Sequence, residues 1–486
     1  MMGNQYHPRT KPFRHQSKGT LRLVSRRNHA LFMEPRLGKT KAVLDAVGML
    51  AQAGKLRRVL VMGPYLSGAW EGVWIDQVRE HYPFIALCEN HEEEWVLNRK
   101  RGGPEVHFYF LHYERFRQRR RTKNGWAYPY LREVERWGPE VIVCDESHRL
   151  KRAGGVTAQA AWRLVRHLRK QSQNGRGYPW VWELTGTPSP KGWIDLFAQF
   201  RIMDETIFGT NKADYEAEFV MYGQGPLRYT ILRYNNISKI LRKVHDHAYT
   251  CSAEEAGLAG EQFWQKLRVD LPPKARKAYV EMAEEFVTEL EGGVVVSAAN
   301  AAVKRLRLLQ ITGGFNTDGH EIHRAKLAAL EEYASDLLQQ GEHLVVYARF
   351  LPEVAACGDS LARVGYKAAV LRGGVRRGDF RDAIRQFQRS DGPRALVFQV
   401  QVGSLAIELA RAAETCIYSA PDGWENYYQC LQRVMGPNQT RPVRYTHILA
   451  RGTLDLAVME TLRQKEDMHR VLLKDPRRFL LGMSDE

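Results

Sequence analysis

The sequence predicts an α/β protein with two lobes of similar size joined by a mainly helical segment. In both halves of the 486-residue chain, short apolar runs rich in β-branched residues alternate with helical stretches, a pattern typical of parallel sheets covered by helices. Residues 194–310 show no clear strand pattern. We therefore expect a first lobe at 1–250 with a helical protrusion from about residue 194, a linker and second protrusion at 251–320, and a second lobe at 321–486.

The strand prediction rests on apolar runs that occur in both halves of the chain. Because each half has its own series of alternating strands and helices, each is expected to build its own sheet. Within the middle segment, residues 274–290 are expected to form one helix that follows Pro272 and Pro273 and is broken at Gly292. The predicted strands are 59–63, 106–111, 141–144, 181–184, 344–347, 368–371, 395–400, 415–418 and 445–449.

Composition narrows the classes of partner. The chain carries 72 Lys and Arg against 55 Asp and Glu, a formal charge of +17, which favours a polyanion, with nucleic acid as the leading candidate and an inert basic surface as the alternative. No apolar run is long enough to span a bilayer, and residues 1–20 lack the apolar core of a secretory signal, so we expect a cytoplasmic protein with no membrane partner. The 6 cysteines lack the spacing of a zinc site or a disulfide framework.

Basic residues gather in three groups along the chain. Each group alone is typical of a solvated surface, but the three together favour an extended track that contacts phosphates. Among them we single out Arg119, Arg120 and Arg121 as candidates for nucleic-acid binding. The groups are Arg9, Lys11, Arg14 and Lys18; Arg117, Arg119, Arg120, Arg121 and Lys123; and Arg163, Arg166, Arg169 and Lys170.

The strongest single motif is Gly38-Lys39-Thr40, which precedes an amphipathic stretch at 41–50. At the N-terminus of a helix, backbone N–H groups and the helix dipole face phosphates, and Lys39 would add a positive charge. The Thr40 hydroxyl can ligate Mg²⁺, and Gly38 lets the backbone approach the phosphate without a Cβ. The motif lacks the first glycine of the full phosphate-binding pattern, so it does not decide the function alone.

A second motif, Asp145-Glu146-Ser147-His148, follows the predicted strand 141–144. A carboxylate at the end of a strand can hold Mg²⁺ through water, and Glu146 can then orient and activate the attacking water. The alternative is a pair of residues that caps a helix. The sequence Thr185-Gly186-Thr187-Pro188 at the end of the next predicted strand favours the catalytic interpretation.

Taken in order along the chain, these motifs resemble the Swi/Snf-type ATPases of helicase superfamily two, from about residue 12 to 465. The resemblance implies two RecA-like lobes, each a parallel sheet flanked by helices, with helical protrusions between them and ATP in the cleft between the lobes. It assigns adenine recognition to Gln16, nucleic-acid contact to Pro64, Tyr113 and Gly403, coupling of hydrolysis to DNA to His148, Thr185 and Thr187, and completion of the catalytic site to Arg433.

Two positions depart from the family pattern. Arg36 stands where the family has a second glycine of its phosphate-binding loop, and a positive φ there would strain a non-glycine residue by about 1 to 2 kcal/mol. Gly436 stands where the family has a second arginine, three residues after Arg433. This second departure puts full hydrolytic competence in question.

The resemblance implies a monomeric motor that uses ATP and Mg²⁺ to move along double-stranded DNA. A strand-separating DNA or RNA helicase is one alternative, and an ATP-gated nucleic-acid clamp with weak hydrolysis is another. Little sequence lies outside the motor, so targeting would come from a protein partner or from DNA structure. The short length suggests a phage or mobile-element source, and hence the cytoplasm of a host cell.

Overall fold

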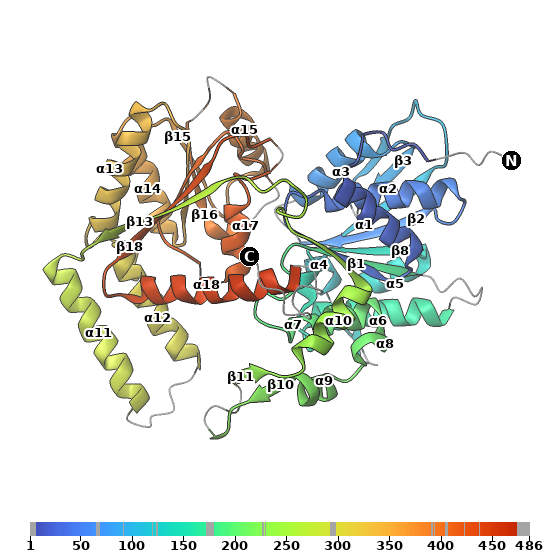
Figure 1. The fold of residues 1–486 in the computed structure, drawn as a ribbon, viewed down its shortest axis with the longest axis horizontal. Coiled ribbons are helices and arrows are strands. Elements are labelled where there is room, and N and C mark those ends of the chain that lie inside the picture. Colours follow the sequence, from blue (N-terminus) through green and yellow to red (C-terminus); the bar gives the residue numbers. More distant parts are fainter. Residues whose placement is uncertain are drawn as a thin grey trace. The chain divides into compact units, whose positions relative to one another are not determined.

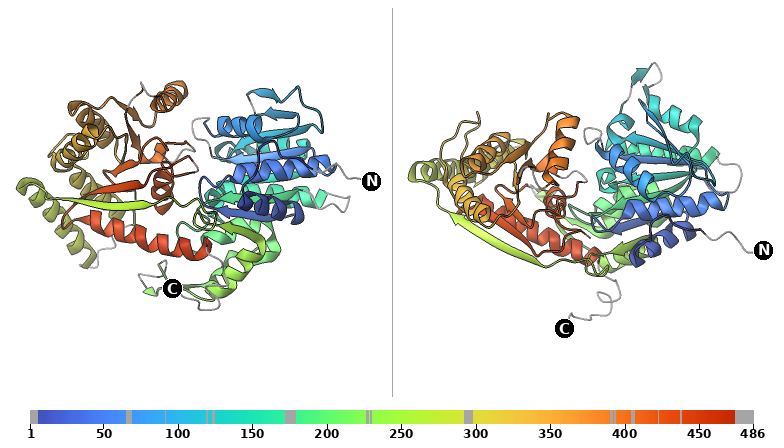
Figure 2. Two further views of the ribbon diagram at one scale, coloured as in Figure 1. Left: turned by 45° about the horizontal axis from the view of Figure 1, so that its top comes forward. Right: turned by 90° about the horizontal axis from the view of Figure 1, so that it is seen from above.

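The protein forms two compact units, one built from residues up to Leu258 together with those from Asp467 onward, and one from Ala259–Glu466 (Figure 1). Each unit contains a parallel sheet with helices on both faces, as the sequence predicts (Figure 2). None of the described helices combines the length and apolar character needed to cross a membrane. The computed structural model describes residues 6–64, 69–90, 92–118, 120–122, 125–171, 179–225, 228, 230–291, 298–389, 392, 394–403, 407–421, 423–436 and 438–473.

The first unit contains an eight-stranded sheet in the order β12-β1-β9-β8-β2-β5-β3-β4. Its strands run parallel except for β4, which pairs antiparallel with β3. The four strands predicted in this half correspond to β2, β5, β8 and β9, and the prediction is confirmed. The strands are β1 His29–Met33, β2 Arg58–Gly63, β3 Ala86–Glu89, β4 Glu94–Leu97, β5 Val106–His112, β8 Val141–Asp145, β9 Trp180–Thr185 and β12 Ala248–Cys251.

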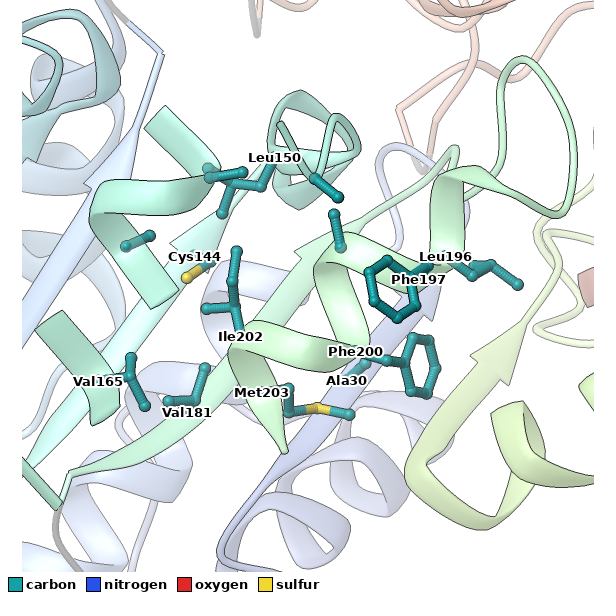
Figure 3. Close-up of a cluster of buried hydrophobic side chains, with 14 of the residues drawn as sticks. Ala30, Cys144, Leu150, Val165, Val181, Leu196, Phe197, Phe200, Ile202 and Met203 are labelled. Carbon is teal, nitrogen blue, oxygen red and sulfur yellow. The ribbon is translucent and has the colours of Figure 1, made fainter. Parts of the chain in front are cut away.

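Alternate residues of the strands build two cores, one on each face of this sheet. On one face, α1 Arg14–Ser25, α2 Lys39–Gln52 and α3 Ala69–His81 pack against side chains such as Val61 and Val143. On the other face, α5 Pro129–Trp137, α6 Val156–Gln171 and α7 Asp195–Met203 cover Cys144 and Val181. Figure 3 shows the side chains of α7, among them Ile202 and Met203, beside these strand residues. The central strands are therefore buried on both faces, as their continuous apolar runs indicate.

Shorter elements complete the first unit. Most of the segment from residue 194 onward is helical, as predicted, but it also contains the strand pair β10–β11 and the edge strand β12. A second antiparallel pair, β6–β7, precedes α5. These elements are α4 Tyr113–Phe116, the 3-10 helix η1 Ser147–Leu150, α8 Glu205–Phe208, α9 Lys212–Phe219, α10 Ile237–His247, β6 Arg120–Thr122, β7 Gly125–Ala127, β10 Val220–Tyr222 and β11 Ile231–Tyr234.

The second unit contains a six-stranded parallel sheet in the order β13-β18-β17-β14-β16-β15. All five strands predicted in this half are confirmed, whereas β13 Gln262–Val269 falls in the segment predicted to be helical. β13 lies at the sheet edge with most of its side chains exposed, so it has no apolar run. The other strands are β14 Leu344–Ala348, β15 Ala368–Leu371, β16 Ala395–Gln399, β17 Glu414–Ile417 and β18 Val443–Ala450.

Helices cover both faces of the second sheet. Leu330 of α13 and Cys357 of α14 belong to the core on one face, and Phe380 of α15 packs against Phe398 of β16 on the other. The helix predicted at 274–290 is confirmed as α11. The helices are α11 Pro273–Glu291, α12 Ala298–Gly313, α13 Ala325–Gln339, α14 Leu351–Arg363, α15 Arg377–Phe387, α16 Val400–Gly403, α17 Trp424–Leu431 and α18 Leu454–Leu473.

Candidate nucleotide-binding site

The phosphate-binding motif forms the loop between β1 and the N-terminus of α2. Two of its residues adopt the left-handed conformation, Arg36 with φ 70° and Gly38 with φ 77°. The positive φ at Gly38 favours glycine, and a Cβ there would lie 2.2 Å from Nε2 of Gln16, so the Gln16 side chain would have to move. Arg36 has the positive φ that the sequence analysis gave as the condition for strain. A non-glycine residue in this conformation raises the free energy of the folded chain by about 1 to 2 kcal/mol. Such strain is typical of functional loops.

Helix α1 supports this loop through two buried side chains. Nε2 of His15 and Nε2 of Gln16 both donate to the carbonyl oxygen of Leu37, at 2.9 Å and 3.2 Å, and Oε1 of Gln16 accepts from the backbone N–H of Phe13. Burial lowers the pKa of His15, which keeps the ring neutral near pH 7. His15 was not singled out in the sequence, because a lone histidine on a helix carries no distinctive pattern.

The Lys39 ammonium lies inside the loop. It donates to the carbonyl oxygens of Met33, at 2.9 Å, and Glu34, at 3.2 Å. The half-buried Thr40 follows in the first turn of α2, which contains no acidic residue. A glycine cradle, an ammonium group, a hydroxyl and helix N–H groups together match the donors that a triphosphate and Mg²⁺ require.

Asp145 ends β8, and its carboxylate is oriented by two donors. Oδ2 accepts from Nε1 of Trp74 at 2.9 Å, and Oδ1 accepts from the backbone N–H of Glu146 at 3.0 Å. The Tyr113 hydroxyl donates to the Asp145 carbonyl oxygen at 2.8 Å. Tyr113 is only 3% exposed, so its ring packs where its hydroxyl supports Asp145, and the contact of this segment with nucleic acid stays a prediction.

A hydrogen-bonded network of His148, Thr185 and Thr187 joins the ends of β8 and β9, and Glu146 lies beside it. Glu146 has φ 51°, a second strained non-glycine residue, and its Oε2 lies 3.3 Å from Nδ1 of the fully buried His148. The same Nδ1 lies 2.8 Å from the Thr185 hydroxyl and 3.4 Å from that of Thr187. The Thr187 N–H in turn donates to the Thr185 hydroxyl at 3.0 Å.

The loop after β9 also packs directly against the phosphate-binding loop. A Cβ at Gly186 would lie 2.7 Å from Cδ of Pro35, so the two backbones are in close contact. The strands β1, β9 and β8 are neighbours in the sheet, and their carboxyl ends carry the three motifs. The structure therefore brings Lys39, Glu146 and Thr185 together at the carboxyl ends of neighbouring strands of one sheet, where α/β proteins bind ligands.

Comparison with known proteins supports the resemblance seen in the motifs. No protein-family profile matches the chain. It is 26% identical over 364 residues to the putative protein p41 of Acyrthosiphon pisum secondary endosymbiont phage 1, which covers 70% of this chain and 74% of that protein. It is also 28% identical over 150 residues to the chromatin-remodeling ATPase INO80 of Aspergillus clavatus, and 25% identical over 148 residues to that of Neurospora crassa. This chain is similar to Swi/Snf-type ATPases.

These matches differ in extent. The INO80 matches cover 30% of this chain and only 9% and 7% of the two INO80 proteins. Among solved structures, the Sulfolobus solfataricus SWI2/SNF2 ATPase core in complex with dsDNA aligns with 15% identity and a TM-score of 0.43, over 100% of this chain and 97% of that chain.

The residues of the first unit expected to contact nucleic acid occupy different environments. Pro64 is buried after β2, and its carbonyl oxygen lies 3.4 Å from Nδ1 of His112. Arg121 is exposed on β6, whereas Arg119 and the side chain of Arg120 lie outside the described residues. In the third basic group, Arg169 binds Asn28, Pro179 and Met203 and is therefore part of the fold.

The second unit carries the remaining residues that the resemblance singles out. Gly403 is the last residue of α16. Arg433 follows α17, is only 4% exposed, and accepts a hydrogen bond at its carbonyl from the backbone N–H of Leu409. Gly436 has φ 136°, which side-chain-bearing residues rarely adopt. An arginine at 436 would therefore be strained. The backbone conformation at this position suits glycine and disfavours the arginine of the family pattern.

Two other arginines near this motif have structural partners. Arg441 forms an ion pair with both carboxylate oxygens of Glu342, at 2.7 and 3.0 Å, and donates to the carbonyl of Arg411. Arg444 lies 3.5 Å from Glu414, the first residue of β17. Both lie at the amino-terminal edge of the sheet, since Glu342 precedes β14.

Proposed function

We propose that this protein is an ATP-dependent motor that moves along double-stranded DNA. The observation that carries the proposal is the meeting of the three motif loops at the carboxyl ends of β1, β9 and β8, where Gly186 contacts Pro35 and His148 contacts Thr185. In this proposal the first unit binds ATP and the second unit contributes Arg433. Similarity to the INO80 ATPases and the charge of +17 support DNA as the partner.

In this proposal, each residue of the candidate site in the first unit has a separate role in ATP binding or hydrolysis. Lys39 binds the β and γ phosphates, and Gln16, beside the loop, contacts adenine. Thr40 and Asp145 hold Mg²⁺, which when bound neutralises phosphate charge. The Glu146 carboxylate accepts a proton from the attacking water and orients it. These roles use the donors and acceptors that the structure gathers at this sheet edge.

The network from Glu146 through His148 to Thr185 and Thr187 offers a route for coupling. Because His148 contacts both hydroxyls and Glu146, a shift of the loop after β9 would reorient the base. In a motor of this kind, ATP closes the two lobes on the duplex and hydrolysis releases them. Movement of DNA along the protein would thereby be tied to ATP turnover.

A strand-separating helicase is a second candidate, favoured by one observation. The β10–β11 hairpin exposes Leu232 by 57% and Met221 by 37%, and apolar side chains can insert between base steps. Displacement of a strand from a forked duplex, measured beside displacement of a third strand from a triplex, separates a helicase from a duplex translocase.

Replacing Glu146 with glutamine should lower ATP turnover by about 10²- to 10⁴-fold while ATP binding is retained, because the amide keeps the shape and cannot accept the proton. Lys39→Ala should lose ATP affinity and turnover together. Steady-state phosphate release and nucleotide titration measure the two quantities. Equal turnover in Glu146→Gln and wild type would refute the assigned role.

A further inference from the structure

The side chain of Gln199, in the middle of α7, joins the two loops that follow β8 and β9. It is fully buried, and its Oε1 accepts a hydrogen bond from the Ser147 hydroxyl at 3.0 Å. Its Nε2 donates to the carbonyl oxygens of Pro188, at 2.7 Å, and Asp195, at 2.8 Å. Ser147 belongs to the acidic motif after β8, and Pro188 ends the motif after β9. One amide therefore bonds to both loops from a helix that lies outside the motifs.

The three hydrogen-bond partners specify an amide at this position. The carbonyl oxygens of Pro188 and Asp195 can only accept, so they fix the place of Nε2, and the Ser147 hydroxyl then donates to Oε1. A carboxylate here would bring a negative oxygen beside two carbonyl oxygens. An apolar side chain would take these bonds from a buried hydroxyl and a buried carbonyl. The identity of this residue is therefore determined by its polar contacts as well as by packing.

The bond to Ser147 holds the residue next to Glu146. Glu146 adopts φ 51°, a conformation that a non-glycine residue keeps only where its surroundings fix it. The next two side chains, Ser147 and His148, are both fully buried. Gln199 holds the first of them, and the Thr185 hydroxyl lies 2.8 Å from Nδ1 of the second. The chain is therefore anchored directly after Glu146 by two elements of the fold, and this anchoring sets the direction of the Glu146 carboxylate.

Helix α7 is a rigid support for this amide. All nine of its residues are buried, and Leu196 and Phe200 pack into the core on this face of the sheet (Figure 3). The Asp195 carboxylate accepts from the backbone N–H of Lys191 at 2.7 Å, which ties the loop after β9 to the first residue of the helix. Groups on packed helices are placed more precisely than groups on loops. Gln199 therefore presents its amide to both loops from a fixed position.

We propose that Gln199 is a positioning residue for ATP hydrolysis, which holds the loop that carries Glu146 and the loop after β9 in one fixed arrangement on α7. This rests on the proposed function, in which Glu146 activates the attacking water. Lys39 and Thr40, the residues proposed to hold the phosphates and Mg²⁺, lie on a third loop, between β1 and α2. Gln199 therefore acts on the chemical step of the reaction and not on ATP affinity.

Turnover and ATP affinity, measured separately in the full chain, test the proposal. Gln199→Met keeps the length of the side chain and removes all three bonds, so turnover at saturating ATP and duplex DNA should fall by about 10²-fold, the effect of a misplaced catalytic group. ATP affinity should stay near the wild-type value. Ser147→Ala removes one of the bonds and should lower turnover by about tenfold. The double variant should be no slower than Gln199→Met, because both changes act on one contact.

Tyr215→Phe is the matched control. The buried Tyr215 hydroxyl donates to the carbonyl oxygen of Trp193 at 2.7 Å, so this variant also loses a buried hydrogen bond of the first unit, but one that ends on neither motif loop. Its turnover should stay near the wild-type value, and thermal unfolding of each variant measures the lost stability.

Three results would overturn the role of Gln199 while hydrolysis by wild type stands. They are wild-type turnover in Ser147→Ala and Gln199→Met, additive losses in the double variant, and an equal fall of turnover in Tyr215→Phe. The milder Ser147→Ala keeps the test decisive if Gln199→Met does not fold. Absence of turnover in wild type on duplex DNA would instead overturn the proposed function.

Discussion

Replacing Arg433 with alanine is expected to lower DNA-stimulated ATP turnover by about 10³- to 10⁵-fold, the effect of removing an arginine that stabilises charge on the transferred phosphoryl group. ATP binding should be mostly retained, because Lys39, Thr40 and Asp145 all belong to the first unit. Arg433→Lys should also lose most of the activity, since an ammonium cannot form the bidentate contacts of a guanidinium. Turnover and nucleotide affinity are measured for each variant.

Arg441→Ala is the control for this prediction. Its guanidinium is bound to Glu342 at the amino-terminal edge of the second sheet, so its loss should leave turnover near the wild-type value. Because Arg433 is buried, thermal unfolding of each variant shows whether lost activity reflects lost folding. Wild-type turnover in Arg433→Ala together with lost turnover in Arg441→Ala would mean that the motif is aligned wrongly.

The second large effect concerns Glu183 in the middle of β9. The side chain is fully buried, and among the described residues neither of its carboxylate oxygens has a hydrogen-bond partner. Burial raises its pKa to about 8 from an ordinary value of 4.5. The folded first unit therefore holds this proton more tightly than the unfolded chain does.

Linkage fixes the sign of the pH dependence. Between pH 4.5 and about 8 the folded protein is protonated at Glu183 and the unfolded chain is not, so the free energy of unfolding falls as pH rises. The full loss, reached above pH 8, is roughly 4 to 5 kcal/mol. Glu183→Leu should remove this loss and raise the free energy of unfolding of the first unit at pH 8.

Urea unfolding of the first unit between pH 5 and 9 measures the effect. Wild type should lose stability across this range, and Glu183→Leu should show a flatter profile. Glu183→Gln should also be flat but less stable than the leucine variant, because its amide is buried without a partner. The same decline in wild type and both variants would show that Glu183 is ionised in the folded protein.

Most strands that are buried on both faces were predictable, although β1 at His29–Met33, which is buried throughout, was not predicted. β2, β5, β8 and β9 contain continuous apolar runs, as central parallel strands require, and each was predicted from its run in the sequence. The edge strand β13 has mostly exposed side chains, including Trp264, and β10 and β11 have only three and four residues. Such strands are set by pairing with distant neighbours, which a local pattern does not record.

The sequence predicts which residues form the candidate site, but it does not predict which other residues contact and support them. The motifs identify Lys39, Asp145 and Glu146, but their supports come from elsewhere in the chain. Trp74 binds Asp145 from α3, and His15 binds the phosphate-binding loop from α1. Tyr113 shows the same limit, since its motif position indicates a nucleic-acid contact and only the fold reveals that its hydroxyl supports β8.

ATP turnover measured with and without duplex DNA tests the central claim most directly. Wild type, Glu146→Gln and a set of ligands comprising duplex, single strand, fork and RNA are compared at one salt concentration. The proposed motor predicts slow turnover alone, strong stimulation by duplex above the other ligands, and no stimulation in Glu146→Gln. ATP binding with no turnover on any ligand would contradict the motor and identify the protein as a nucleotide-gated clamp.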